Sequence, residues 1–409
     1  MRIEVINTGT ELLLGKVINT HAAFFGDELF KLGLRIFRQT TIPDGDDIQR
    51  VLEEAFPRCD AILITGGLGP TSDDITRETV AGLLGLPLHK DEAVWEHIRQ
   101  FFLKRGREAN SWNERQAMVP EGAEVLPNPN GTAPGLFVPA TAGKTPHLFL
   151  LPGPPRELRP MFHGEVLPRL RQLSDSEILP WRNFKIYGVG ESNIAEAIEP
   201  RVQDIDGLEY GYCCRLGEVD VRLIGPEAAI ETASGVLRDE FAEAIVTESE
   251  TPIEQVIIEM LTEHGRTVAT AESCTGGLIA STLTDISGSS AVFHRGYVTY
   301  ANEAKAELLG VSESMLAEHG AVSEPVARAM AEGCLAKSSA DFAIAVTGIA
   351  GPTGGSDEKP VGTVFFAVAS TGGDTVVRHE CFTSDRISFK ARTCRAALDL
   401  LRRRICGFV

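Results

Sequence analysis

The stretch "DAILITGG", residues 60–67, decides the fold of the first part of the chain. A short apolar run that ends in two glycines is typical of a buried strand that stops at a turn. Comparable β-rich runs stand at "RIEVINTG" (residues 2–9) and "LRIFRQTTI" (residues 34–42), with helical patterns between the runs. This alternation predicts a parallel sheet covered by helices over residues 1–172.

Turn-rich segments in this part follow strand-like runs or lie between elements. They are "NTGTELLLG" (7–15), "TGGLGPTSDDITRE" (65–78), "NPNGTAPG" (128–135) and "LPGPPRE" (151–157). Ligands of parallel sheets gather at the carboxyl ends of the strands. We therefore expect these segments to line one cleft.

The pattern changes over residues 173–249, which hold "FKIYGVGESNIAEAI" (184–198) and "YGYCCRLGEVDVRLIG" (210–225). They predict a small α+β module of about three strands and two helices, with no catalytic grouping. Residues 250–409 begin with the helical periodicity of "IEQVIIEMLTEHG" (253–265) and then alternate strand-like and helical runs again. The predicted fold class is therefore α/β, with two three-layer α/β/α domains joined by the small α+β module.

The composition argues against several kinds of binding partner. A formal net charge of −18 opposes binding to nucleic-acid backbone or to anionic lipid, both of which favour clustered Lys and Arg. The eight cysteines show no CxxC pair and no regular spacing, so we expect reduced thiols rather than disulfides or a zinc site. No apolar run approaches bilayer length, and we expect a cytoplasmic protein without membrane or nucleic-acid partners.

The stretch "AESCTGG", residues 271–277, places Ser273 at a strand-to-helix turn. Gly276 and Gly277 would let backbone N–H groups approach a bound group, and a helix N-terminus there would stabilise an oxyanion or a phosphate. The simpler interpretation is that Ser273 is an N-cap, since serine is a favoured capping residue. Cys274 is a rival nucleophile, because a thiol at a helix N-terminus can be acidified.

The segment "YVTYANEAKAELLG", residues 297–310, places Tyr300 at a strand end and Lys305 in the first turn of a helix that Asn302 would cap. Lysine is unexpected there, since the helix dipole disfavours cations. With a lowered pKa, Lys305 could accept a proton from a serine; otherwise it points into water.

A glycine loop, "VTGIAGPTGGSDEKPVGT" (346–363), follows another strand-like run and includes Gly351. Such backbone binds phosphates or polar rings through its N–H groups, although many glycine loops are only turns. Arg386 stands just ahead of the last predicted helix. Its guanidinium would bind a phosphate through two parallel N–H groups, or it would only form an ion pair with Asp385.

Together, "AESCTGG", "GSSAVFHRGYVTYANEAKAELLGV", "HGAVSEPVA" and "VTGIAGPTGGSDEKPVGTV" resemble the C-terminal domain of the CinA family, which also occurs alone as the bacterial nicotinamide mononucleotide (NMN) deamidase. The segments "NTGTELLLGKVINTH", "TIPDGDDI" and "TGGLGPTSDDITRE" resemble the CinA N-terminal domain, itself similar to molybdopterin-binding proteins. The resemblance covers nearly the whole chain and is least distinctive in the middle module.

For the C-terminal domain the resemblance implies hydrolysis of NMN to nicotinic acid mononucleotide and ammonia, with no cofactor. The catalytic serine of the family falls on Ser273, with partners on Tyr300 and Lys305. Substrate-contacting residues fall on Thr347 and Arg386. A reasonable mechanism is attack by Ser273 on the amide carbon, with Lys305 and Tyr300 relaying the proton and N–H groups near Gly276 holding the oxyanion.

For the N-terminal domain the resemblance implies either a pyrophosphatase that acts on ADP-ribose with a divalent cation, Mg²⁺ or similar, or a pterin-binding fold. The glycine loop at Gly66, Gly67 and Gly69 suits phosphate contact. Asp44 and Asp74 match the carboxylate positions of the molybdopterin-binding relatives and could hold the metal ion. The neighbouring Asp73 serves the site or only caps a helix.

The leading hypothesis is thus a bifunctional enzyme of pyridine-nucleotide recycling, a homodimer whose partners are NMN and ADP-ribose. Two alternative hypotheses assign the chain to other functional classes of protein. The name of the family suggests a non-enzymatic competence or DNA-damage scaffold. The acidic charge argues against direct contact of such a scaffold with nucleic acid, but not against protein partners. The N-terminal glycine loop suggests a pterin-binding protein.

Overall fold

The strands and helices of the computed structural model are described for residues 1–141, 143–174 and 176–409. These residues form two compact units, Met1–Ile178 and Leu179–Val409. The second unit contains two separate sheets, one on each side of the predicted boundary at residue 249.

The sheet of the first unit has six strands in the order β2-β1-β3-β8-β7-β6. β1 runs parallel to β2 and β3, and β3 runs parallel to β8, whereas β7 and β6 are antiparallel. The expected parallel sheet is confirmed for the first four strands. The strands of this unit, including the separate pair β4 and β5, are β1 (Ile3–Thr8), β2 (Ile36–Ile42), β3 (Ala61–Thr65), β4 (Leu88–Lys90), β5 (Met118–Pro120), β6 (Glu124–Leu126), β7 (Gly135–Val138) and β8 (His147–Leu151).

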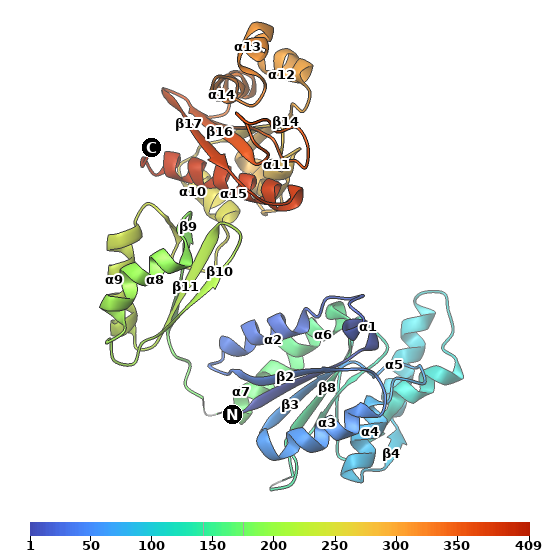
Figure 1. Ribbon diagram of the computed structural model, residues 1–409. Coiled ribbons are helices and arrows are strands. Elements are labelled where there is room, and N and C mark those ends of the chain that lie inside the picture. Colours follow the sequence, from blue (N-terminus) through green and yellow to red (C-terminus); the bar gives the residue numbers. More distant parts are fainter. Residues whose placement is uncertain (142, 175) are drawn as a thin grey trace. The chain divides into compact units, whose positions relative to one another are not determined.

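Helices cover both faces of this sheet (Figure 1). Phe25 of α2 and Phe162 pack on one face, and Leu52 of α3 and Val80 of α4 pack on the other. The carboxyl edge of the parallel strands stays open between these layers. The helices are α1 (Thr10–Leu13), α2 (His21–Phe30), α3 (Asp47–Ala55), η1 (Phe56–Arg58), α4 (Thr76–Leu84), α5 (Glu92–Leu103), η2 (Ser111–Ala117), α6 (Pro155–Met161), η3 (Phe162–Val166) and α7 (Leu167–Leu173).

The smaller sheet of the second unit is antiparallel, in the order β10-β11-β9-β12. Two helices pack on one of its faces through Ile194, Ile198, Ile230 and Leu237. The structure adds a fourth strand, β12, to the predicted three. The elements are β9 (Trp181–Tyr187), α8 (Glu191–Val202), β10 (Glu209–Cys214), β11 (Glu218–Ile224), α9 (Glu227–Phe241) and β12 (Ile245–Thr247).

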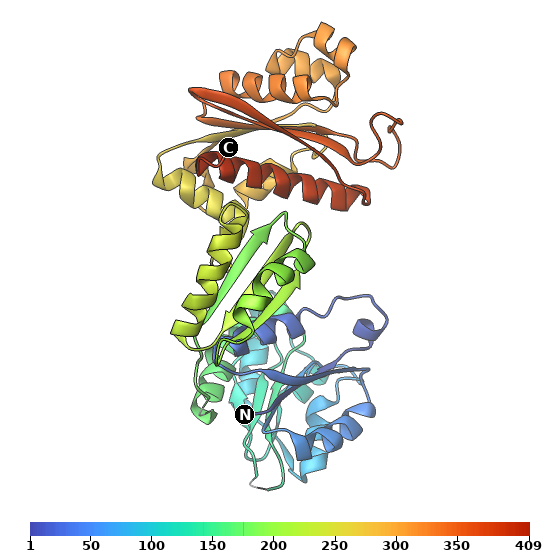
Figure 2. The ribbon, with the colours of Figure 1, turned by 60° about the vertical axis from the view of Figure 1, so that its left-hand side comes forward.

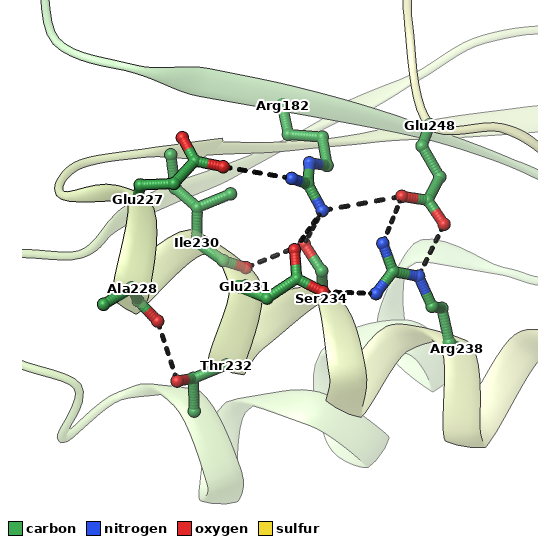
Figure 3. A network of polar contacts seen from close by, with 9 residues as sticks. All are labelled: Arg182, Glu227, Ala228, Ile230, Glu231, Thr232, Ser234, Arg238 and Glu248. Atoms are coloured by element: carbon green, nitrogen blue, oxygen red, sulfur yellow. Dashed lines mark hydrogen bonds and ion pairs between the residues drawn. The ribbon is translucent and has the colours of Figure 1, made fainter.

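An ion-pair network connects β9, α9 and the segment after β12 (Figure 3). Arg182 donates to Glu231 at 2.8 Å and to Ser234 at 3.1 Å. Arg238 bonds Glu231 and Glu248, each at 2.6 Å. Because these groups are partly exposed, each pair contributes little to stability on its own, and the network mainly fixes the position of Glu248 ahead of the next domain.

The larger sheet of the second unit has the order β14-β13-β15-β16-β17, with β13 parallel to β14 and β15 and the last two strands antiparallel. Figure 2 shows this sheet between α12–α14 on one side and α10, α11 and α15 on the other. The three-layer prediction is thereby confirmed. The elements are α10 (Ile253–Glu263), β13 (Val268–Glu272), α11 (Leu278–Thr284), η4 (Ser289–Ala291), β14 (Phe293–Val298), α12 (Asn302–Leu309), α13 (Glu313–His319), α14 (Glu324–Ser338), β15 (Phe342–Gly348), β16 (Thr363–Ser370), β17 (Gly373–Cys381) and α15 (Arg386–Ile405).

Among the helices described, none combines the length and the apolar composition that crossing a bilayer requires.

Candidate active sites

The turn that carries Ser273 follows β13 directly. Because β13 runs parallel to both of its neighbours, the carboxyl ends of three strands meet at this edge of the sheet. The N–H of Ser273 donates to the carbonyl of Val346 on β15 at 3.1 Å, and the N–H of Thr299 donates to the carbonyl of Glu272 at 2.8 Å. These two bonds extend the strand pairing beyond β13 and hold the turn between its neighbours.

Ser273 does not cap the helix that follows it. α11 begins at Leu278, and its cap position is taken by Gly277 at φ +96°, with no side-chain cap. Glycine suits this left-handed conformation because it has no Cβ. The N-cap interpretation is therefore wrong, and the Ser273 hydroxyl is free for other bonds.

Lys305 lies against that hydroxyl. Its Nζ donates to Ser273 Oγ at 3.3 Å and to the carbonyls of Thr299 at 2.9 Å and Tyr300 at 3.4 Å. Lys305 is 1% exposed and Ser273 is 9% exposed, so the prediction that Lys305 points into water is wrong. Burial lowers the pKa of Lys305, as expected for a base that accepts the serine proton.

The segment before Lys305 differs slightly from the prediction. β14 ends at Val298, two residues before Tyr300. α12 begins at Asn302, with Ala301 in the cap position, so Asn302 is the first helical residue and not the cap. Lys305 is still in the first turn of α12, where its side chain turns back towards the strand ends.

The carboxylate of Glu272 binds the backbone N–H groups at the start of α11. Its carboxylate accepts hydrogen bonds from the N–H groups of Gly277 at 3.0 Å, Ile279 at 3.0 Å and Ala280 at 2.8 Å, and the side chain is 1% exposed. A carboxylate at this position satisfies helix N–H groups that have no partner within the helix. Glu272 thus fixes the start of α11 and, with it, the turn at Ser273.

The backbone N–H groups near Gly276 are already used. The N–H of Gly276 donates to the carbonyl of Ser273 at 3.1 Å, and that of Gly277 donates to Glu272. The expectation that these two amides bind substrate or hold the oxyanion therefore needs correction. Among the residues described, the amides of Cys274 and Thr275 donate to no other backbone oxygen, and both lie next to the Cys274 thiol.

Replacing Glu272 tests this arrangement. Glu272→Ala leaves the buried amide of Ile279 and the partly buried amides of Gly277 and Ala280 without their acceptor, so we expect the free energy of unfolding of this domain to fall by about 2–4 kcal/mol. Urea denaturation of the full chain, followed by fluorescence and circular dichroism, measures the change. Glu307→Ala, at an exposed position of α12, is the control and should cost less than about 0.5 kcal/mol. Equal effects of the two variants would contradict this role.

Cys274 is an unsuitable nucleophile. Its side chain is buried, and burial raises the pKa of its thiol to about 12, so the thiol stays protonated at neutral pH. The backbone N–H groups of Cys274 and Thr275 act to lower this pKa, but burial outweighs them and the charge of Glu272 acts in the same direction as burial. This favours Ser273 as the nucleophile.

The phenol of Tyr300 lies apart from the Ser273 and Lys305 pair. Its hydroxyl accepts a hydrogen bond from Arg386 Nη2 at 3.0 Å, and Arg386 Nη1 donates to the carbonyl of Gly351 at 2.9 Å. Asp385 instead caps α15 through the N–H groups after it, so the alternative pairing of Arg386 with Asp385 is wrong. Arg386 therefore joins Tyr300 to the glycine loop, and contact between the Tyr300 hydroxyl and Lys305 stays a prediction.

Thr347 lies next to the strand end that holds Ser273. It follows Val346 on β15, is 1% exposed, and donates its hydroxyl hydrogen to the carbonyl of Ala321 at 2.7 Å. Its hydroxyl is thus engaged with the backbone in this structure. Contact between Thr347 and a substrate stays a prediction.

A second candidate site is a cavity of about 410 Å³ at the carboxyl edge of the sheet in the first unit. All the residues predicted for the N-terminal site line it, and the turn-rich segments surround it as expected. Gly66 and Gly67 have φ values of +95° and +65°, a backbone conformation that brings N–H groups to the surface of a loop. The predicted residues on the lining are Asp44, Gly66, Gly67, Gly69 and Asp74.

The two carboxylates predicted to hold a metal ion in this cavity, Asp44 and Asp74, are held by local hydrogen bonds. Asp44 accepts from the N–H of Thr10 at 2.9 Å, and Asp74 accepts from the N–H of Thr71 at 2.9 Å and from its hydroxyl. The described residues contain no group of three or more metal-ligating side chains. Mg²⁺ is usually held by one or two carboxylates together with substrate phosphates, so the pair fits that metal ion.

Asp73 is not the cap of α4. That helix begins at Thr76, with Ile75 in the cap position and no side-chain cap. Asp73 instead lines the cavity. Arg115 donates to the carbonyl of Thr71 at 2.8 Å and so stabilises the loop that carries Asp73 and Asp74.

Comparison with known proteins decides the family. Residues 250–405 match the CinA C-terminal domain, and residues 4–172 match the "Probable molybdopterin binding domain". The chain is 48% identical to the CinA-like protein of Akkermansia muciniphila over 398 residues, which cover 97% of this chain and 96% of that protein. The chain belongs to the CinA family.

Solved structures are similar to part of the chain as well. Competence/damage inducible protein CihA from Agrobacterium tumefaciens is 49% identical over 37% of this CinA-family chain and 92% of that chain, with a TM-score of 0.36. Competence damage-inducible protein A (ComA) from Klebsiella pneumoniae is 39% identical over 38% of this chain and 97% of that chain, with a TM-score of 0.37.

Two residues of the CinA C-terminal site were not predicted from the sequence. Glu272 lies within the quoted motif, and a carboxylate just ahead of a glycine-rich helix start was the signal that could have found it. Lys390 lies on α15 four residues after Arg386, close to the turn at Gly276. The spacing of four residues was its signal, since it places both cations on one face of the helix.

Proposed function

We propose that the C-terminal domain hydrolyses the carboxamide of NMN to nicotinic acid mononucleotide and ammonia. The contact that carries this proposal is the hydrogen bond of 3.3 Å between Lys305 Nζ and Ser273 Oγ, at a strand edge where both groups are buried. Burial lowers the pKa of Lys305, which increases the fraction of neutral amine at a given pH. A serine with such a neighbour is an activated nucleophile.

Ser273 Oγ attacks the carbon of the amide while neutral Lys305 accepts the hydroxyl proton. The carbonyl oxygen becomes an oxyanion, which the N–H groups of Cys274 and Thr275 would bind, since neither donates to another backbone oxygen. Lys305 then gives its proton to the amide nitrogen, which leaves as ammonia and breaks the C–N bond. Water attacks the resulting ester while Lys305 accepts a proton from it. Lys305 then returns this proton to Ser273 Oγ as the acyl C–O bond breaks and the acid is released.

Arg386 and Tyr300 serve to position the substrate in this scheme. Their hydrogen bond of 3.0 Å, together with that from Arg386 to the Gly351 carbonyl, holds the glycine loop beside the aromatic ring. The Tyr300 side chain is 60% exposed, so its ring is open to a bound pyridine. Stacking of aromatic rings would orient the carboxamide towards Ser273.

For the N-terminal domain we propose hydrolysis of ADP-ribose with Mg²⁺. Asp44 and Asp74 would hold the metal ion, which neutralises charge on the diphosphate and lowers the pKa of a bound water. The N–H of Gly66 already donates to the carbonyl of Leu151 at 3.0 Å, so phosphate oxygens would bind the N–H of Gly67, which lines the same cavity. Arg115 keeps the loop in place through the Thr71 carbonyl.

The two activities are separable by mutation. Asp44→Asn and Asp74→Asn should each lower the rate of ADP-ribose hydrolysis by about 100-fold or more, because each removes a carboxylate charge from the metal site. Ammonia release from NMN should stay unchanged. Asp47→Asn, on α3 and outside the cavity, is the matched control. Chromatography of the products measures both reactions, and unchanged ADP-ribose hydrolysis in both variants would contradict the assignment.

The decisive experiment incubates the intact protein with NMN and, separately, with ADP-ribose and Mg²⁺. We expect ammonia and nicotinic acid mononucleotide from the first mixture, and AMP with ribose 5-phosphate from the second. A homogeneous preparation that releases no ammonia from NMN would overturn the C-terminal assignment.

A further inference from the structure

Lys390 lies over the turn that carries Ser273. Its Nζ is 3.7 Å from the point at which a Cβ of Gly276 would stand, and Gly276 is only three residues beyond Ser273. Arg386 stands one helical turn earlier on α15, and residues four apart share a helix face. Lys390 therefore borders the turn, and Arg386 lies on the same face of α15.

The carboxylates near these cations are occupied elsewhere. Asp385 accepts hydrogen bonds from the N–H groups of Ile387 and Ser388 at the start of α15. Glu272 is buried beneath the turn and accepts from the amides of α11. Within the described residues, neither Lys390 nor Arg386 forms an ion pair with a carboxylate at a distance of 4.0 Å or less.

The local charge is therefore opposite to that of the whole molecule. The chain carries a net charge of −18, but Lys390 and Arg386 place positive charge without a carboxylate partner on the face of α15 that reaches the turn at Gly276. Arg386 is already bonded to Tyr300 and Gly351, whereas the ammonium of Lys390 has no hydrogen bond to another described residue. Lysine binds phosphate as a point charge without needing fixed geometry, so Lys390 is free to take an anionic group.

We propose that Lys390 binds the phosphate of a mononucleotide substrate and so makes the site prefer the phosphorylated substrate to the unphosphorylated nucleoside. This inference rests on the proposed amide hydrolysis. Lys390 is a specificity residue in this scheme, because it contacts the substrate away from the amide that reacts. It should therefore act on substrate binding and leave the chemical step nearly unchanged.

Steady-state kinetics with NMN and nicotinamide riboside test the proposal. Lys390→Ala should raise KM for NMN by about 10- to 100-fold and change kcat by less than about threefold, since the phosphate contact is equal in ground and transition states. The value of kcat/KM for the riboside should not change. Lys390→Arg should restore most of the preference, and Lys337→Ala, an exposed lysine of α14, should behave as the wild type.

Binding of NMN to the Ser273→Ala variant, measured by calorimetry, gives a readout that does not depend on turnover. Adding Lys390→Ala to that variant should weaken NMN binding by about 10-fold or more and leave riboside binding unchanged. Equal losses for both ligands, or no loss for NMN, would overturn the role of Lys390. Failure of the proposed function looks different, because the wild type would then bind NMN through Lys390 without releasing ammonia.

Discussion

Ser273→Ala lowers the rate of ammonia release from NMN by about 10⁴-fold or more, because it removes the nucleophile on which the covalent route depends. The substitution should leave the fold intact, since the Ser273 hydroxyl accepts only the bond from Lys305 and takes no part in capping α11. A coupled ammonia assay on purified full-length protein measures the rate.

Cys274→Ala is the matched control at the adjacent position. The buried thiol has a pKa raised to about 12 and is not a nucleophile at neutral pH, so we expect less than about tenfold loss of activity. The remaining loss comes from the small change in packing at a buried position. Loss of activity in the cysteine variant alone would overturn the assignment of Ser273.

Lys305→Met should lower kcat by about 10³-fold or more, because the proton of Ser273 then has no acceptor. Methionine has nearly the length of lysine and fits a buried site, so the variant should fold. Thermal unfolding followed by circular dichroism checks folding, and the ammonia assay checks activity. An active, folded Lys305→Met variant would exclude Lys305 as the base.

The pH profile of the wild type gives an independent check of the same residue. Burial lowers the pKa of Lys305 below 10.5, while the nearby Cys274 and Glu303 act in the opposite direction. The reaction needs the neutral amine, so kcat/KM should rise with pH up to this lowered pKa and level off above it. The rising limb should be absent from the residual activity of Lys305→Met.

Stability should depend on pH in the same direction. Between the lowered pKa of Lys305 in the folded protein and its ordinary value in the unfolded chain, the unfolded state binds more protons than the folded state. The contribution of Lys305 to the free energy of unfolding therefore increases as the pH rises through this window. Below the lowered pKa, the amine is charged in both states and the cost of its burial stays constant.

The proposed pair explains why a lysine stands in the first turn of α12. The helix dipole and the loss of hydration both disfavour a charged amine there, and the two carbonyls of Thr299 and Tyr300 compensate only in part. The same conditions that cost stability favour the neutral amine. A strained or destabilised group of this kind is common where a protein trades stability for activity.

The sequence by itself determined the alternation of strands and helices, the glycine turns and the positions of the candidate groups. These features are local, since the period of the apolar residues and the presence of glycine depend on neighbours within one element. "DAILITGG" could be assigned to a strand and its turn for this reason, and the structure confirms β3 at Ala61–Thr65. Ser273 and Lys305 were likewise named from their places at a strand end and a helix start.

Only the tertiary structure decided which groups meet and which are withdrawn from water. Ser273 and Lys305 are 32 residues apart and come together because β13 pairs with β14. The same packing buries Cys274 and gives the amides of α11 to Glu272. Burial and hydrogen-bond partners are set by segments distant in the chain, so no local pattern could separate the nucleophile from the cap or the thiol.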